Sequence, residues 1–286
     1  MSEQIRAAYQ GERGAFSETA ARRLLGASMT GVPYDSFESI FTAVRDGDAD
    51  CCVAPIENSL AGSIHRNYDL VLESNLTIIG ETNLRIVHHL IAPPNVDVER
   101  IRRVYSHPVA LAQCTRFFAA HPAVEPVAVH DTAGAARLVL ERGRNDEAAI
   151  ASADAASIYG GRVLASGIED HPQNFTRFLL LASGGQALLP VRDRQECLSS
   201  TRWKTSLMFR VPNKPGSLFR ALGAFAVFDI DLSKIESRPV EGRPWEYAFY
   251  LDIIGREGDP KVEQALQTLR AMAELVKVLG CYPTRW

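Results

Sequence analysis

Short apolar runs alternate with stretches of helical periodicity from the start of the chain to about residue 181. Phe37, Ile40 and Val44 keep the spacing of one helix face, whereas residues 51–54 form the continuous apolar run of a buried strand. We predict strands at 5–9, 51–54, 84–92, 103–105, 127–129, 147–151 and 175–181. We predict helices at 18–25, after a capping box at Asp35 and Glu38, at 64–72, from 108, at 133–141 and at 153–159. This alternation indicates parallel sheets covered by helices.

Residues 184–201 break the pattern with two glycines, a proline and several charges, and we interpret them as a linker. After the linker the order of elements changes. We predict strands at 206–211, 232–236, 247–254 and 276–279, with helices at 217–226 and 260–275. The resulting β-α-β-β-α-β order is the ferredoxin-like α+β pattern.

Composition excludes several classes of function. The 286 residues carry a formal net charge of −3, which gives no basic footprint for nucleic acid or for an anionic membrane. No apolar run approaches the roughly 20 residues that span a bilayer, and the first residues lack the apolar core of a signal peptide. The five cysteines include no C-x-x-C pair, so we expect a reducing, cytoplasmic location. The seven histidines show no zinc-ligand spacing, so we expect no metal.

Polar residues recur where a predicted strand passes into the next helix. Ser17, Asn58, Ser106 and Thr132 all occupy such positions. In open α/β sheets these junctions gather at the carboxyl ends of the strands, where ligands bind. Each junction also offers free N–H groups at a helix start, which suit an anion. The alternative interpretation is ordinary N-capping, for which Ser, Thr and Asn are favoured.

Two segments carry more polar chemistry than their surroundings explain. Residues 55–63 place Glu57, Asn58, hydroxyls and a glycine between a buried strand and a helix. Within the otherwise apolar strand 175–181, Thr176 and Arg177 stand side by side. Side chains alternate along a strand, so these two residues take opposite faces. A buried arginine needs partners, which makes a purely structural role for Arg177 costly.

These residues together resemble the prephenate dehydratase family. The similarity rests on residues 11–17, 55–63, 106–108 with Gln113, 131–132 and the Thr-Arg-Phe tripeptide 176–178. After the linker, residues 213–218 and 236–239 are similar to the two motifs of a phenylalanine-binding ACT domain. No all-helical segment precedes the first strand, so we do not expect a fused chorismate mutase.

The resemblance implies an α/β catalytic domain at 1–183 with two lobes, like a type 2 periplasmic binding protein. One lobe comprises about 1–80 with 175–183, the other comprises 81–174, and an ACT domain follows at 202–286. The implied activity is decarboxylating dehydration of prephenate to phenylpyruvate, without a cofactor. By the same resemblance Thr176 is the donor to the departing hydroxyl. The implied substrate-binding residues are Ser17, Glu57, Asn58, Ser106, Gln113, Thr132 and Arg177.

The second domain implies feedback inhibition by L-phenylalanine, bound between two ACT domains of a dimer or tetramer. Gly216 lets backbone approach a ligand closely, and Ser217 is the predicted N-cap of the following helix. The implied effector contacts are Asn213, Pro215, Gly216, Ser217, Leu218, Glu236, Ser237, Arg238 and Pro239. Two alternatives stay open: an arogenate dehydratase, which acts on the transaminated substrate, and a non-catalytic amino-acid sensor on the same fold.

Overall fold

The computed structural model describes residues 4–184 and 202–284. Nearly all of the predicted linker, at 185–201, lies outside the described residues. The chain divides into two compact units, one of Met1–Ile64 with Thr82–Phe178 and one of His65–Glu81 with Leu179–Trp286. Each unit is described separately below.

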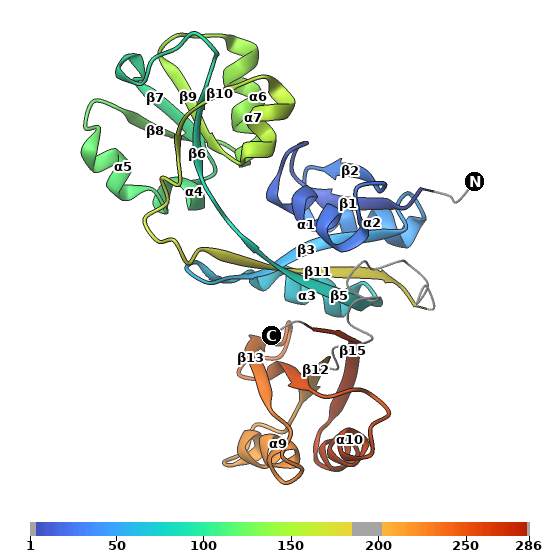
Figure 1. Ribbon diagram of the computed structural model, residues 1–286. Helices are drawn as coiled ribbons and strands as arrows, with labels where there is room; N and C mark the ends of the chain where they lie inside the picture. The colour runs from blue at the N-terminus through green and yellow to red at the C-terminus, as the bar shows by residue number, and fades with distance from the viewer. Residues whose placement is uncertain (1–3, 185–201, 285–286) are drawn as a thin grey trace. The chain divides into compact units, whose positions relative to one another are not determined.

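The first sheet has the strand order β2-β1-β3-β11-β5, with the short β4 paired to β3. β1 runs parallel to both β2 and β3, so the carboxyl ends of the three strands share one edge. Helices α1 and α2 connect these strands (Figure 1). The bounds are β1 Arg6–Gln10, α1 Phe16–Leu25, β2 Thr30–Tyr34, α2 Phe37–Asp46, β3 Cys51–Asn58, β4 Gly62–Ser63, β5 Leu76–Arg85 and β11 Phe175–Ser183.

The second sheet has the order β10-β6-β9-β7-β8. β7 runs parallel to β8 and β9, whereas β6 is antiparallel to its neighbours, so the sheet is mixed. Its core is built from small side chains of α6 and β9, among them Ala133, Ala136 and Ala149. The bounds are β6 His89–Ala92, η1 Val98–Arg100, β7 Arg103–Ser106, α4 Pro108–Ala112, α5 Thr115–Ala120, β8 Glu125–Ala128, α6 Thr132–Arg142, β9 Glu147–Ala151, α7 Ala153–Tyr159 and β10 Arg162–Ser166.

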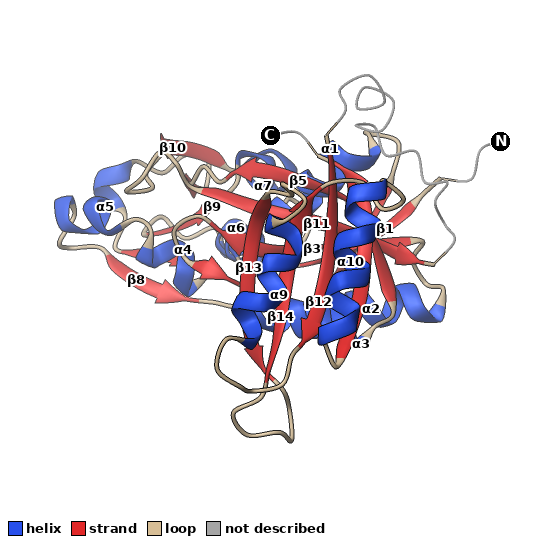
Figure 2. Cartoon of the chain, turned by 90° about the horizontal axis from the view of Figure 1, so that it is seen from below, coloured by secondary structure: helices blue, strands red, loops and turns tan. Residues whose placement is uncertain are grey.

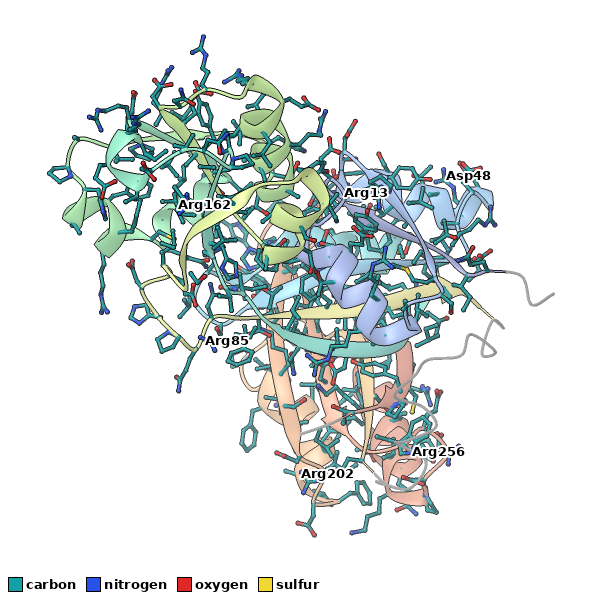
Figure 3. All side chains as sticks on the ribbon, turned by 45° about the horizontal axis from the view of Figure 1, so that its top comes forward. Arg13, Asp48, Arg85, Arg162, Arg202 and Arg256 are labelled. Atoms are coloured by element: carbon teal, nitrogen blue, oxygen red, sulfur yellow. The ribbon has the colours of Figure 1, made fainter. Side chains whose placement is uncertain are left out.

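The passage between the two sheets differs from the prediction of one strand at 84–92. β5 ends at Arg85 and β6 begins at His89, because the N–H of His88 donates to the Glu169 carboxylate instead of to a neighbouring strand (2.9 Å). Arg85, labelled in Figure 3, lies where β5 leaves the first sheet, and its guanidinium is 3.6 Å from the same carboxylate. The break lets the chain turn from the first sheet into the second.

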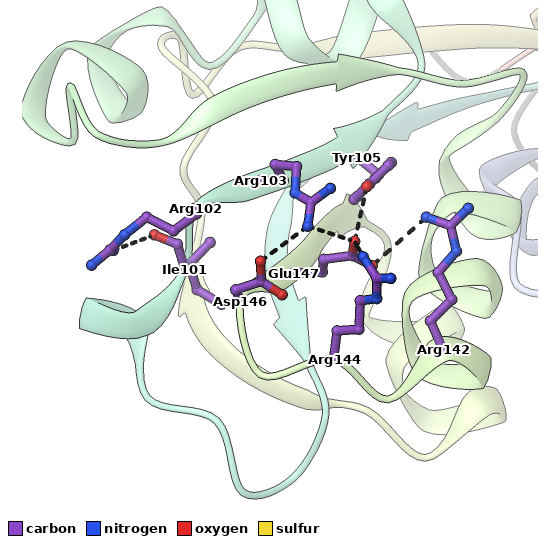
Figure 4. Close-up of polar contacts among 8 residues, drawn as sticks. All are labelled: Ile101, Arg102, Arg103, Tyr105, Arg142, Arg144, Asp146 and Glu147. Carbon is purple, nitrogen blue, oxygen red and sulfur yellow. Dashed lines mark hydrogen bonds and ion pairs between the residues drawn. The ribbon is translucent and has the colours of Figure 1, made fainter.

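A buried carboxylate in the second lobe is surrounded by three arginines (Figure 4). The Glu147 side chain is fully buried at the start of β9 and accepts a hydrogen bond from the Tyr105 hydroxyl (3.0 Å). Arg103, Arg144 and Arg142 place guanidinium nitrogens at 3.3, 3.4 and 3.7 Å from its oxygens. A buried charge of this kind is tolerated only when it is paired. The cluster is at the amino ends of β7 and β9, so it supports the lobe and stays away from the ligand-binding edge.

The second unit contains a four-stranded antiparallel sheet with the order β13-β14-β12-β15. Helices α9 and α10 lie over one face of this sheet (Figure 2), where Phe209, Phe225 and Leu266 are buried. The bounds are β12 Trp203–Arg210, α9 Ser217–Ala226, β13 Leu232–Pro239, β14 Tyr247–Ile254, α10 Pro260–Met272 and β15 Leu275–Pro283.

Helix α3 (His65–Glu73) and the start of β5 pack on the same sheet in this unit. The Tyr250 hydroxyl donates to the Tyr68 carbonyl (3.0 Å), and the two rings meet edge to face. Lys204 and Glu81 form a buried ion pair at 2.7 Å. At Gly280 a Cβ would stand 2.1 Å from the Ile78 carbonyl oxygen, so the two backbones meet directly.

The two mixed α/β lobes and the ferredoxin-like domain confirm the predicted fold class. Strands β2, β4 and β10 were not predicted, and of β5 only residues 84–85 fell within a predicted strand. β2 and β10 lie at sheet edges where apolar periodicity is weak. The N-cap predictions were wrong by one residue at both sites. Ser36, not Asp35, accepts the capping bond of α2, and Gly216 rather than Ser217 is the N-cap of α9. None of the described helices is long and apolar enough to cross a membrane.

Candidate active site

A cavity of about 540 Å³ lies between the two lobes, within the first unit. Its walls come from the ends of strands and the starts of helices, as predicted from the way strand-to-helix junctions gather at one edge of a sheet. Five of the residues named from the sequence line it: Ser17, Asn58, Gln113, Thr132 and Thr176. Phe16 and Phe178 add apolar walls suited to a carbocyclic ring.

Asn58 is the centre of a hydrogen-bond network whose direction the backbone fixes. Its Oδ1 accepts from the N–H groups of Leu60 (3.0 Å) and Ala61 (2.8 Å), which can only donate. Its Nδ2 must therefore donate, and it does so to the Thr176 hydroxyl oxygen at 2.9 Å and to Asn174 Oδ1 at 2.8 Å. The orientation of the amide follows from these partners rather than from an arbitrary choice of atom.

The same logic fixes the Thr176 hydroxyl. A hydroxyl carries one proton and two lone pairs, and one lone pair of Thr176 is used by Asn58. Asn58 is the hydroxyl's hydrogen-bond partner among the residues that the structure describes, so its proton is free to point into the cavity. This geometry is compatible with the predicted donor role of Thr176, which stays a prediction.

Gln113 extends the network across the cavity. Its Oε1 accepts from Asn174 Nδ2 (2.9 Å) and lies 3.0 Å from His88 Nε2. Its Nε2 faces Asn58 Oδ1 at 3.4 Å. Asn58 belongs to the first lobe and Gln113 to the second, so two residues distant in sequence meet at one site.

Four helix starts open onto the cavity, those of α1, α2, α4 and α6. Ser36, His107 and Asp131 cap three of them, and Thr132 is the first residue of α6. Free N–H groups at such termini favour anions. Of the described residues that line the cavity, none is an arginine or a lysine. Carboxylates in this cavity would therefore meet helix termini, amides and histidines.

Three of the predicted binding residues do not line the cavity: Glu57, Ser106 and Arg177. Ser106 is fully buried and its hydroxyl donates to the Ile150 carbonyl (2.6 Å), so it is used inside its own lobe. Arg177 is buried on the face of β11 opposite Thr176, as strand alternation requires. A substrate-binding role for these three residues stays a prediction.

Sequence reasoning did not assign the three histidines that line the cavity, His88, His107 and His130. His107 follows the last residue of β7, a position that could have drawn notice. Burial, together with the nearby His130, lowers the pKa of His107. The described residues contain no group of three or more His, Cys, Asp or Glu side chains placed to hold a metal ion.

The loop before α1 holds the lobes together. Gly14 has a φ of +84°, and a Cβ there would stand 2.7 Å from the Cα of Ala155 in the second lobe. Its carbonyl accepts from the Ser152 hydroxyl (2.6 Å), and its N–H donates to the buried Glu18 (2.7 Å). Burial alone would raise the pKa of Glu18, but the Gly14 N–H and Arg22 together lower it.

The residues proposed for the effector lie in the second unit. Gly216 starts α9 with a φ of +78°, and Asn213 donates to the Trp245 carbonyl (3.1 Å). The side chains of Glu236 and Arg238 point to α3: Glu236 is 3.3 Å from His65, and Arg238 forms a bidentate pair with Asp69. Effector binding by these residues stays a prediction.

Comparison with known proteins shows which families this chain is similar to. The family model of prephenate dehydratase matches residues 7–186, and that of the ACT domain matches residues 205–271. The arogenate dehydratase/prephenate dehydratase 2 of Arabidopsis thaliana is 43% identical over 98% of this chain and 73% of the relative.

Two solved structures are similar over nearly the whole chain. One is a prephenate dehydratase from Arthrobacter aurescens in complex with L-Phe, with a TM-score of 0.86 and 33% identity over 98% of this chain and 90% of that one. The other is GqqA, described as a novel type of quorum-quenching acylase, with a TM-score of 0.86 and 34% identity over 98% of both chains. The resemblance found in the sequence motifs is thus confirmed, and the chain belongs to the prephenate dehydratase family, a family of carbon–oxygen lyases, with an ACT domain after the catalytic region.

Proposed function

We propose that this cavity converts prephenate to phenylpyruvate, CO2 and water in the synthesis of L-phenylalanine, with Thr176 as the donor to the departing hydroxyl. The observation that supports this role is the polarity of the Asn58–Thr176 hydrogen bond. Asn58 donates to the Thr176 oxygen, which leaves the hydroxyl proton available to a ligand in the cavity.

The chemistry needs little else from the protein. The bond between the ring and its carboxylate breaks, and CO2 leaves while the electron pair moves into the ring. The ring C–O bond breaks in turn, and the ring becomes aromatic. The departing oxygen takes up one proton from solvent to leave as water, and Thr176 stabilises it by donation and can relay that proton. A threonine hydroxyl is a weak acid, so stabilisation as the oxygen departs is favoured over prior protonation.

The substrate carboxylates fit the rest of the cavity. The helix starts at Ser17 and Thr132 and the Gln113 amide supply N–H donors from both lobes. Two anionic groups can be held apart in this way without a lysine or arginine, and the lobes enclose the ring between them.

Arogenate is the alternative substrate, and the acidic residues of the cavity give a reason to test it. Asp35, Glu38 and Asp131 also line the walls, and a carboxylate is the group that the ammonium of arogenate would meet. Steady-state turnover of the two substrates by the full chain separates the cases. A higher kcat/KM for prephenate supports the proposal, and a higher value for arogenate would replace it.

Acylase activity, which the description of GqqA names, finds less support in this cavity. That reaction needs a nucleophile activated by a base. Of the described contacts, His88 bonds to Gln113, His107 accepts from the Val109 N–H, and His130 bonds to the Asp35 carbonyl. None of these partners is a hydroxyl or thiol nucleophile.

We further propose that L-phenylalanine inhibits the enzyme through the ACT domain, that the chain self-associates to a dimer or tetramer, and that it works in the cytoplasm. The motif at 213–218 and the segment 236–239 support the first point. Repeating the assay with L-phenylalanine and measuring mass by light scattering test the first two. No inhibition, or a monomer at micromolar concentration, would contradict them.

A further inference from the structure

His88 is a buried side chain that the mechanism above does not use. It is 2% exposed, lines the cavity and lies edge to face with the Phe16 ring. Its backbone is held on both sides, since its N–H donates to Glu169 (2.9 Å) and its carbonyl accepts from the Ile168 N–H (3.1 Å). Such a fixed ring has little freedom other than the choice of which nitrogen carries the proton.

The network around Asn58 decides that choice. Asn58 donates to Asn174 Oδ1, so Asn174 presents its Nδ2 to Gln113 at 2.9 Å. The Gln113 atom facing Asn174 must therefore be its oxygen, and this same oxygen lies 3.0 Å from His88 Nε2. An amide oxygen only accepts, so His88 Nε2 carries a proton and donates. The remaining nitrogen, Nδ1, is buried and has no hydrogen-bond partner among the described residues.

We propose that His88 is a positioning residue of this site, a neutral Nε2–H donor that fixes the Gln113 amide with its NH2 group toward the substrate. Two donors on the Gln113 oxygen, His88 and Asn174, hold that oxygen away from the ligand. One Nε2 hydrogen of Gln113 faces Asn58 Oδ1, and the other is left for an anionic or hydroxyl group of the substrate. The inference rests on the proposed function only in taking Gln113 as a substrate contact.

The buried environment favours the neutral ring. A cationic ring would need a partner for a second N–H, and Nδ1 has none among the described residues. Burial, with a smaller contribution from the neighbouring His89, correspondingly lowers the pKa of His88, and the Gln113 hydrogen bond and Glu169 only partly oppose this shift. His88 thus donates without titrating near neutral pH, which distinguishes it from a general acid or base.

A matched pair of substitutions tests the donor. Gln and Met have nearly the same shape, but H88Q retains an N–H donor and H88M does not. We expect H88M to lower kcat/KM by about 10- to 100-fold, as misplacement of a contact residue does. We expect H88Q to stay within about threefold of the parent and to keep its pH profile. In a Q113A background, H88M should lower kcat/KM by less than about a further twofold, because the Gln113 amide that His88 positions is already absent.

Several outcomes would overturn the proposal. Equal activities of H88M and H88Q would remove the role of the N–H donor, and a full additive loss of H88M on Q113A would show that His88 does not act through Gln113. A pH limb that is lost in H88Q would make His88 a titrating group instead. Imidazole 15N shifts of the unaltered protein provide a check that needs no folded variant: a charged or Nδ1–H ring at pH 7 contradicts the assignment. If the parent turns over neither prephenate nor arogenate, the proposed function is refuted. The 15N measurement of the His88 tautomer is independent of that result.

Discussion

Replacing Thr176 by Val tests the proposed chemistry most directly. Valine keeps the branched shape of the side chain and removes only the hydroxyl. The hydroxyl is the group that we propose donates to the departing oxygen, and loss of such a donor costs about 10²–10³ in kcat, or about 2.7–4 kcal/mol. KM should change far less, because the contact strengthens only as the C–O bond breaks.

The structure also indicates what the substitution does to folding. Without the Thr176 oxygen, the Asn58 amide still donates to Asn174 Oδ1 (2.8 Å) and to the Phe175 carbonyl (3.2 Å). No buried donor is left unsatisfied, so the free energy of unfolding should fall by only about 0.5–1.5 kcal/mol. The catalytic loss therefore exceeds the loss of stability, and the two can be told apart.

The assay is the formation of phenylpyruvate at saturating prephenate, with Tm measured in parallel. Thr176→Ser is the control, because it restores a hydroxyl at the same Cβ and should recover most of kcat. A Thr176→Val enzyme that retains more than about a tenth of the parental kcat is incompatible with the reasoning, since it places the loss below the lower end of the range for one such donor.

Three further predictions concern two glycines and one buried carboxylate. Gly14→Ala should destabilise the protein by about 1–3 kcal/mol in chemical denaturation and impair turnover, because the added Cβ meets the backbone of α7. The control is Gly47→Ala, which is also at positive φ but faces open space and should leave turnover intact. Gly216→Val should abolish inhibition by L-phenylalanine and spare basal turnover, and Gly258→Val should keep both; unchanged inhibition would place the effector elsewhere. Because the pKa of Glu18 is lowered in the folded state, its contribution to stability is present above the ordinary carboxylate pKa of about 4.3 and is lost as pH falls through the folded value. Glu18→Gln should therefore be less stable than the parent at pH 7, and the difference should shrink below about pH 4; a constant difference would contradict the assignment.

Much of the cavity could be anticipated because its chemistry follows topology. Ser17, Asn58 and Thr132 lie at junctions between strand and helix, and parallel strands bring such junctions to one edge. Strand alternation likewise placed Thr176 and Arg177 on opposite faces. These arguments need only the backbone path, which the hydrophobic pattern specifies.

Side-chain direction at a junction is harder to predict. Ser106 occupies the same kind of junction as Asn58, yet its hydroxyl turns inward to the Ile150 carbonyl. The break between β5 and β6 was missed because it depends on Glu169, a residue 81 positions after His88. The polarity of the Gln113 amide depends on a chain of contacts from two lobes, which no local pattern contains.

The close contact between β15 and β5 limits how the sensing domain can be exchanged between such enzymes. At Gly280 there is no room for even a methyl group against the Ile78 carbonyl, and Lys204 meets the buried Glu81 beside it. A chimaera that receives its sensing domain from another family member would have to inherit a glycine at the first position and a cation at the second. Compatibility between donor and recipient would then depend on these two positions more than on the overall identity of the transplanted domain.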